Sequence, residues 1–154
     1  MKKIKIERRK YPRYDTELKV YFQVRYDVRT KVKFQIMTNG REGAVPHKYS
    51  GLSKNVSAEG LSFASNKRLE NGDILFIEVY EPKAKGPIRM EGQVRWSRKI
   101  PRTKGKNIFQ TGVELFSVNG KPVADSIYFD KKYKVMWSAV LDSVFGSFAS
   151  TMGA

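Results

Sequence analysis

Short runs of alternating apolar and polar residues, separated by turn signals, limit the possible folds of this chain more than any other feature. The clearest run is Leu18, Val20, Phe22 and Val24 with polar or basic residues between them, a period of two that is typical of a half-buried strand. Further strands are expected at residues 49–56, 61–65, 74–79, 88–96 and 109–115. Gly92, inside the longest of these runs, indicates a bend or bulge. The pattern predicts a mainly β fold, a small antiparallel barrel of six or more strands.

The period changes after residue 119. Apolar and aromatic residues between Tyr133 and Phe148 recur at steps of three and four, which predicts an amphipathic helix of roughly four turns. Asp130 is expected to cap the start of this helix. We interpret the aromatic stripe as packing across one end of the barrel, with a surface for another chain as the alternative.

The charge of the chain limits its partners. The sequence has 30 Lys and Arg residues against 15 Asp and Glu, a formal net charge of +15. Such an excess attracts polyanions, so a nucleotide, nucleic acid, acidic protein or anionic membrane is the expected class of partner. The chain has no cysteine, which excludes disulfides and is compatible with a cytoplasmic location. Neither a signal peptide nor a run of about 18 apolar residues is present, so export and a membrane span are not expected.

No arrangement of residues in the sequence points to catalysis. His47 is the only histidine and stands beside Pro46. The acidic residues of the strands and turns lack the spacing of a metal site or a carboxylate pair. Nucleophile-elbow, phosphate-loop and zinc patterns are also missing. We therefore expect a protein that is not an enzyme and that has neither a metal site nor a cofactor.

Two polar motifs indicate a binding function. The first is an arginine cluster in which Arg8, Arg9 and Lys10 are followed by Pro12 and Arg13. Proline favours an extended or turning backbone here. Guanidinium groups hold phosphate through two parallel hydrogen bonds, so Arg9 and Arg13, with Arg8 beside them, are suited to clamp an anion.

The second motif lies at the end of a predicted strand. Asn55 and Ser57 are two residues apart, so they are expected to share a face and to present an amide and a hydroxyl that suit a base edge. Gly60 permits the tight turn that follows. Trp96, on a later strand, either stacks on a purine or packs at the core or rim, and both interpretations stay open.

In this order, Arg9-x-x-x-Arg13 and Asn55-x-Ser57-x-x-Gly60 resemble the PilZ family, and the resemblance extends to residues 94–96 and 111–115. PilZ domains are small β-barrels that bind the bacterial second messenger cyclic di-GMP and relay the signal to partners. The resemblance implies a cyclic di-GMP receptor with an unidentified protein partner. The ligand-binding residues that it implies are Arg8, Arg9, Arg13, Asn55, Ser57 and Gly60, with Lys10 and Trp96 as weaker candidates.

These patterns divide the chain into three segments. Residues 1–14 form a basic N-terminal arm, which is expected to be mobile and to order around the ligand. Residues 15–118 form the barrel, and residues 119–154 form a linker and the amphipathic helix. The gap between the two motifs is longer than expected for the family, so residues 27–50 are predicted to be an inserted hairpin or loop.

Two other functions are compatible with the sequence. One is a basic barrel that binds single-stranded nucleic acid along aromatics such as Tyr21, Phe63 or Trp96. The other is a protein-interaction adaptor that no longer binds nucleotide and uses the C-terminal helix. Nucleic acid is the less favoured partner, and the sequence leaves open whether the chain forms a homodimer.

Overall fold

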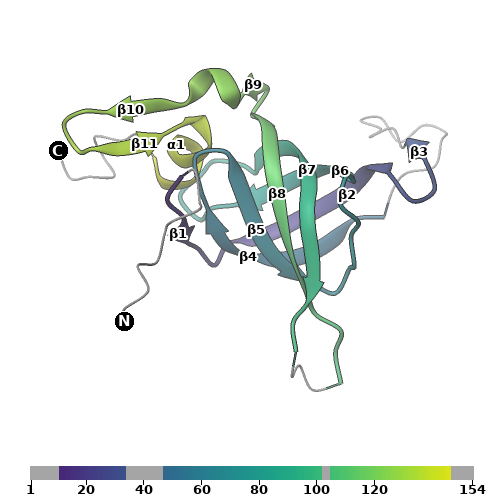
Figure 1. Ribbon diagram of the computed structural model, residues 1–154. Helices are drawn as coiled ribbons and strands as arrows, with labels where there is room; N and C mark the ends of the chain where they lie inside the picture. Colours follow the sequence, from purple (N-terminus) through teal and green to yellow (C-terminus); the bar gives the residue numbers. More distant parts are fainter. Residues whose placement is uncertain (1–10, 34–46, 102–104, 147–154) are drawn as a thin grey trace, which may run out of the picture.

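The computed structural model describes residues 11–33, 47–101 and 105–146. Its centre is a closed barrel of six antiparallel strands (Figure 1). These strands are β2 (Lys19–Asp27), β4 (Tyr49–Val56), β5 (Gly60–Ser65), β6 (Ile74–Tyr80), β7 (Ile88–Lys99) and β8 (Phe109–Val118). Their order is β4-β5-β8-β7-β6-β2, and pairing of β2 with β4 closes the barrel. The prediction of a small antiparallel β-barrel is confirmed.

The core of the barrel follows the alternation of the sequence. On β2, Val20, Phe22 and Val24 are buried while the residues between them are not. Phe63 on β5 is also fully buried, at 0% exposure. The suggestion that Phe63 is an exposed aromatic for nucleic acid is therefore wrong, because the side chain lies inside the barrel.

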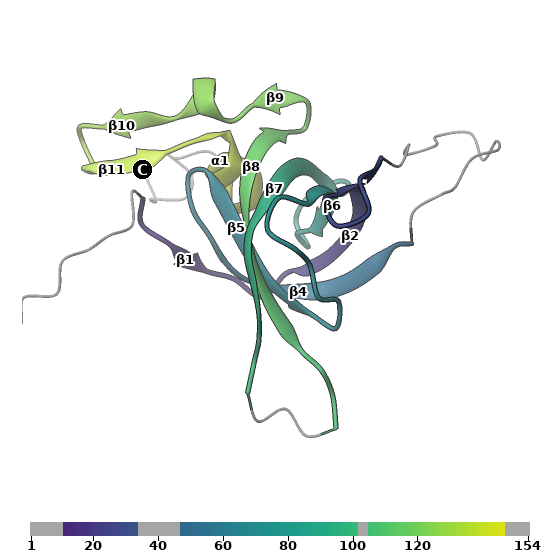
Figure 2. The same ribbon diagram turned by 45° about the vertical axis from the view of Figure 1, so that its right-hand side comes forward.

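Three short strands extend this sheet. β1 (Tyr14–Asp15) pairs with the end of β4, β3 (Val32–Lys33) pairs with the end of β2, and β9 (Lys121–Pro122) pairs with β8. The β2–β3 pairing begins the segment predicted to be inserted, most of which lies outside the described residues. The β7–β8 hairpin projects beyond the barrel, away from the C-terminal elements (Figure 2).

The C-terminal region contains less helix than the sequence predicts. After a short 3-10 turn (η1, Ala124–Ser126), β10 (Tyr128–Asp130) and β11 (Val135–Trp137) form a separate hairpin. The helix α1 covers only Ala139–Phe145. The prediction of a helix that starts near Tyr133 is therefore wrong, and Phe148 lies outside the described residues. Lys134 has a left-handed φ of 56°, which ends the turn between the two strands and is incompatible with a continuous helix.

Two caps account for this arrangement. Ser138 precedes α1, and its side chain accepts a hydrogen bond from the backbone N–H of Val140 at 3.2 Å, as expected of an N-cap. Asp130 instead accepts from the backbone N–H of Tyr133 at 2.9 Å, so it stabilises the hairpin turn. The predicted cap by Asp130 thus belongs to the hairpin, not to the helix.

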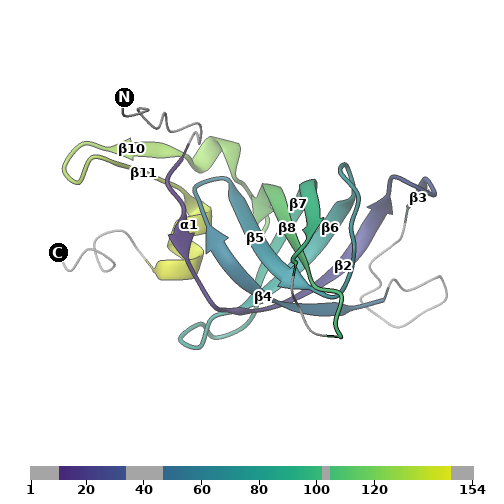
Figure 3. The ribbon, with the colours of Figure 1, turned by 60° about the horizontal axis from the view of Figure 1, so that its bottom comes forward.

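The C-terminal stripe packs within the molecule. Val140, Leu141 and Val144 of α1 are buried, as is Trp137 of β11. The Tyr14 ring of β1 lies edge-on to Trp137, with ring centroids 6.0 Å apart. In Figure 3, α1 and β1 lie side by side at one end of the barrel. The interpretation as core packing is confirmed for these residues. None of the described helices is long and apolar enough to span a membrane.

Candidate functional site

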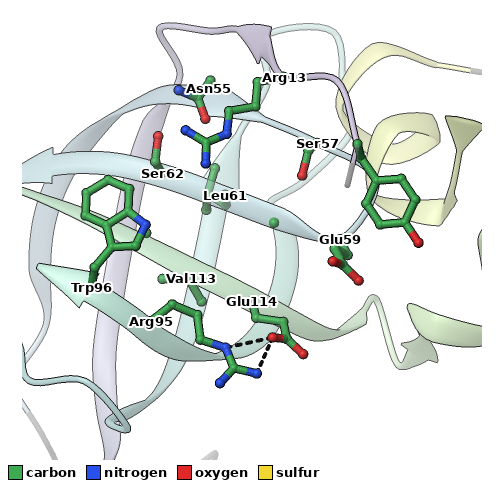
Figure 4. A pocket seen from close by; sticks show the side chains of 13 residues that line it. Arg13, Asn55, Ser57, Glu59, Leu61, Ser62, Arg95, Trp96, Val113 and Glu114 are labelled. Carbon is green, nitrogen blue, oxygen red and sulfur yellow. Dashed lines mark hydrogen bonds and ion pairs between the residues drawn. The ribbon is translucent and has the colours of Figure 1, made fainter. Parts of the chain in front are cut away.

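A pocket of about 200 Å³ lies on the outer face of β4, β5, β7 and β8 (Figure 4). It is lined by Tyr11, Arg13, Asn55, Ser57, Glu59, Gly60, Leu61, Ser62, Arg95, Trp96, Gly112, Val113 and Glu114. All the predicted binding residues that the structure describes are therefore brought to one pocket. The other three, Arg8, Arg9 and Lys10, lie outside the described residues.

The pairing of β1 with β4 brings the two sequence motifs together. Asp15 lies opposite Asn55 across this pair of strands, and the Thr16 N–H donates to the Lys54 carbonyl at 3.0 Å. Arg13, just before β1, is exposed and lies beside the Asn55 side chain in Figure 4. The first described arginine of the chain is thus held next to the amide of the second motif.

The β4–β5 turn positions the rest of that motif. The Ser57 N–H donates to the Gly60 carbonyl at 2.9 Å, which closes the turn. A Cβ atom on Gly60 would lie 3.2 Å from the Val113 carbonyl oxygen and 3.3 Å from Ser57 Oγ. Glycine therefore allows the turn to lie close against β8 without moving Ser57.

One row of residues runs across the four strands under the pocket. Asn55 of β4 pairs with Ser62 of β5, Ser62 pairs with Gly112 of β8, and Gly112 pairs with Trp96 of β7. Directly opposed residues on neighbouring strands share a face of a sheet. Under the pocket, this row thus presents the amide of Asn55, the hydroxyl of Ser62, the backbone of Gly112 and the indole of Trp96.

Two β-bulges turn the ends of this row outward. The register shifts between Ser53 and Asn55 on β4, and between Val94 and Trp96 on β7. Ser53 and Val94 are buried, at 1% and 0% exposure. In a regular strand, the residues two positions later would also face the core. The extra residue in each bulge reverses this and places Asn55 and Trp96 on the outer face.

Trp96 lies flat against the backbone of Gly112. A Cβ atom at position 112 would be 2.2 Å from Trp96 Cε2, which leaves no room for a side chain. The Arg98 guanidinium lies 4.9 Å from the centroid of the same indole. Trp96 is half-buried at the rim, and its indole nitrogen is on the side that faces the pocket (Figure 4).

The charges around the pocket are balanced. Arg13 and Arg95 line it together with Glu59 and Glu114. Arg95 is oriented by Glu114, whose Oε2 accepts from Arg95 Nε at 2.7 Å. The pocket therefore suits a neutral group with a polar edge better than a bare polyanion. Among the described residues, no group of three or more His, Asp or Glu side chains is placed to hold a metal ion.

Several lining residues were not predicted from the sequence. They are Tyr11, Glu59, Leu61, Ser62, Arg95, Gly112, Val113 and Glu114. Ser62 carried a usable signal, because it stands two residues after Gly60 on the same strand and so shares its face. For Gly112 and Arg95 the sequence carried no such signal, because their place depends on which strands are neighbours.

The PilZ domain family model matches residues 7–122. Similar solved structures include the Bacillus subtilis inhibitor of motility MotI/DgrA, at 21% identity and a TM-score of 0.49, over 75% of this chain and 46% of that one. The PilZ domain of Escherichia coli YcgR with c-di-GMP matches at 14% identity and a TM-score of 0.40, over 71% and 76% of the two chains.

This chain thus spans about half of the length of MotI/DgrA. No curated protein sequence matches it. The family match extends from before the arginine motif to β9 and includes every residue that lines the pocket. The chain belongs to the PilZ domain family.

Proposed function

We propose that this pocket binds cyclic di-GMP and that the domain is a receptor or adaptor without catalytic activity. The observation that carries the proposal is the meeting of Arg13 with Asn55, Ser57 and Gly60 around one pocket. These residues come from two motifs more than 40 positions apart in a chain of the PilZ family.

The size and charge of the pocket support binding of a base. Its volume of about 200 Å³ is below the roughly 300–1,000 Å³ of pockets that enclose a whole drug-sized ligand. One guanine of the dinucleotide occupies it, and the rest of the ligand extends beyond the rim. The Asn55 carbonyl accepts from guanine N–H groups, and the Ser57 hydroxyl adds a second contact to the base edge.

The phosphates are held by arginine. Arg13 stands exposed at the rim, and Arg8, Arg9 and Lys10 precede it in the N-terminal arm. The arm orders around the ligand, with Arg9 and Arg13 as the clamp. Ordering of the arm changes the surface that a protein partner meets, which is how the domain relays the signal.

Substitution of Arg13 and of Asn55 tests the proposal. Calorimetric titration with cyclic di-GMP should show that Arg13→Ala and Asn55→Ala each weaken binding about ten- to hundredfold, the size of a hydrogen bond to a charged or buried group. Thermal unfolding of Arg13→Ala should stay close to that of the unmodified protein, because Arg13 is exposed. Arg89→Ala, an exposed arginine of β7 that does not line this pocket, is the matched control. Undiminished binding in both pocket variants would contradict the proposal.

Salt dependence separates this function from binding of single-stranded nucleic acid. Polyanion binding weakens steeply with salt because counterions are released. A dinucleotide held by few contacts should show a shallower dependence and a preference over GMP and RNA. A steep dependence with equal affinity for RNA would favour the nucleic-acid alternative.

A further inference from the structure

Ser62 carries the one buried side-chain polar atom without a hydrogen-bond partner in the described part of the chain. The residue is 3% exposed, and its Oγ atom is shielded from solvent. Buried hydroxyl groups are nearly always hydrogen-bonded, because an unmet donor and acceptor in a protein interior is unfavourable. A buried hydroxyl without a partner therefore requires an explanation.

The position of Ser62 provides one. Its neighbours on β5, Leu61 and Phe63, are buried in the core at 4% and 0% exposure, and successive side chains of a strand alternate between its faces. Ser62 is buried on the outer face, in the middle of the row between Asn55 and Gly112. In Figure 4 its hydroxyl points toward the side chains of Asn55 and Arg13. The unpaired hydroxyl is thus directed into the pocket.

The absence of a side chain on Gly112 and the position of Trp96 define the other side of this hydroxyl. The indole occupies the space over Gly112 and offers an aromatic surface and an N–H group. Asn55 lies on the opposite side of Ser62. A planar group that enters between them meets Asn55 and Ser62 along one edge.

We infer that the Ser62 hydroxyl hydrogen-bonds the base of the bound ligand, together with Asn55, as a further specificity-determining contact of this pocket. A hydroxyl both donates and accepts, so it complements an amide on a base edge that presents groups of both kinds. Because the hydroxyl is covered in the free protein, the ligand reaches it by displacing a covering side chain. This inference rests on the proposed function.

The test is calorimetric titration of Ser62→Ala with cyclic di-GMP. The affinity should fall about three- to tenfold, as expected for one hydrogen bond. The thermal unfolding temperature should be unchanged or raised, because no bond within the protein is lost. Ser65→Ala is the matched control. Ser65 is equally buried on β5, on the core-facing side, and its Oγ accepts from the Lys67 N–H at 3.2 Å, so its removal should lower the unfolding temperature and leave affinity unchanged.

A double variant shows whether Ser62 and Asn55 hold the same base. If they do, the loss in Asn55→Ala with Ser62→Ala should differ from the product of the two separate losses. Equal affinity of Ser62→Ala and the unmodified protein overturns this inference alone. A fall in affinity that is matched by a loss of stability as large as that of Ser65→Ala also overturns it. Failure of the unmodified protein to bind cyclic di-GMP overturns the proposed function as well.

Discussion

Two regions of the barrel surface combine cations with aromatic rings, but they differ in how their polar groups are used. One is the pocket with Arg13, Arg95 and Trp96. The other is the lysine–tyrosine patch, which consists of Lys19, Tyr21, Lys48 and Tyr80 beside β2 and β6. By composition, either region fits a basic protein that binds nucleotides.

The charged and aromatic groups of the lysine–tyrosine patch contact one another or a neighbouring carboxylate. The rings of Tyr21 and Tyr80 meet edge to face, with centroids 5.4 Å apart. Lys48 Nζ forms an ion pair with Glu78 at 2.8 Å, and both lysines lie within 6 Å of the Tyr21 ring, at 5.6 and 5.8 Å. Below the patch, β2 and β6 pair in regular register, with Lys19 opposite Tyr80 and Tyr21 opposite Glu78. The register shift of this pair lies farther along, between Val24 and Tyr26. The patch is thus a self-contained surface cluster.

The pocket differs from the patch in its backbone and in containing a polar group that has no hydrogen-bond partner. It is bordered by two bulges and has a glycine at the centre of its floor. It also contains the unpaired Ser62 hydroxyl. The comparison teaches that charge and aromatic content do not distinguish a binding site from an ordinary surface. Groups that lack a partner within the protein are the better guide.

Among the substitutions that test this difference between the two regions, Gly112→Ala is expected to have the largest effect. The new Cβ would lie 2.2 Å from Trp96 Cε2, so the indole must leave its place. Overpacking of this kind typically costs about 1–3 kcal/mol of folding stability. Because the displaced indole no longer lines the pocket as it does now, affinity for cyclic di-GMP should fall by about tenfold. Tryptophan emission should change, because Trp96 shifts while Trp137 stays buried. Gly86→Ala, where a Cβ has nothing within 4 Å, is the control. Unaltered affinity and emission would show that the pocket does not depend on its glycine floor.

Lys48→Met tests whether the ammonium group of Lys48 is already paired with Glu78 in the folded protein. The hydrogen bond to Glu78 raises the Lys48 pKa above its usual 10.5; burial opposes this shift, and the negative charge of Glu78 adds to it. A raised pKa in the folded state stabilises the fold below the unfolded-state value, and this contribution disappears as pH rises through the folded-state value. The side chain is 49% exposed, so the loss at neutral pH should be below about 1 kcal/mol.

Thermal unfolding at two pH values measures this effect. The unmodified protein should be slightly more stable than Lys48→Met at pH 7, and the gap should close at strongly alkaline pH. Glu78→Gln removes the same pair from the other side and should give a similar gap. A gap that persists at alkaline pH would assign it to packing and not to charge.

Removal of the patch gives the smallest expected effect on ligand binding. Lys19→Ala combined with Tyr21→Ala changes the half-buried and exposed surface away from the pocket. Surface substitutions of this kind are usually within about 0.5 kcal/mol, so cyclic di-GMP affinity should change by less than about twofold. A loss as large as that of Gly112→Ala would show that the two regions act as one site and would break the comparison.

The C-terminal region shows where local patterns mislead. Residues 133–145 carry a helical spacing of apolar side chains, but Val135 to Trp137 pair with Tyr128 to Asp130 as strands. β-Branched and aromatic residues favour an extended backbone when a partner strand is available. The same residues then bury Trp137 against α1 and β1. The expected interior contacts formed, although the first part of the expected helix, residues 133–138, is not helical.

By itself, the sequence determined the strands of the barrel, the turn at Gly60 and the motif residues of the pocket. The strands and the turn follow from the period of two and from local backbone preferences, which act over a few residues. The motif residues were indicated by the chemistry of their side chains and by their resemblance to the PilZ family. Only the tertiary structure decided how the pocket is built. Trp96 continues the alternation of Met90 and Val94, yet one extra residue at Arg95 turns it outward. A bulge, a glycine under an indole and an unpaired hydroxyl each depend on the neighbouring strand, and that neighbour is distant in the sequence.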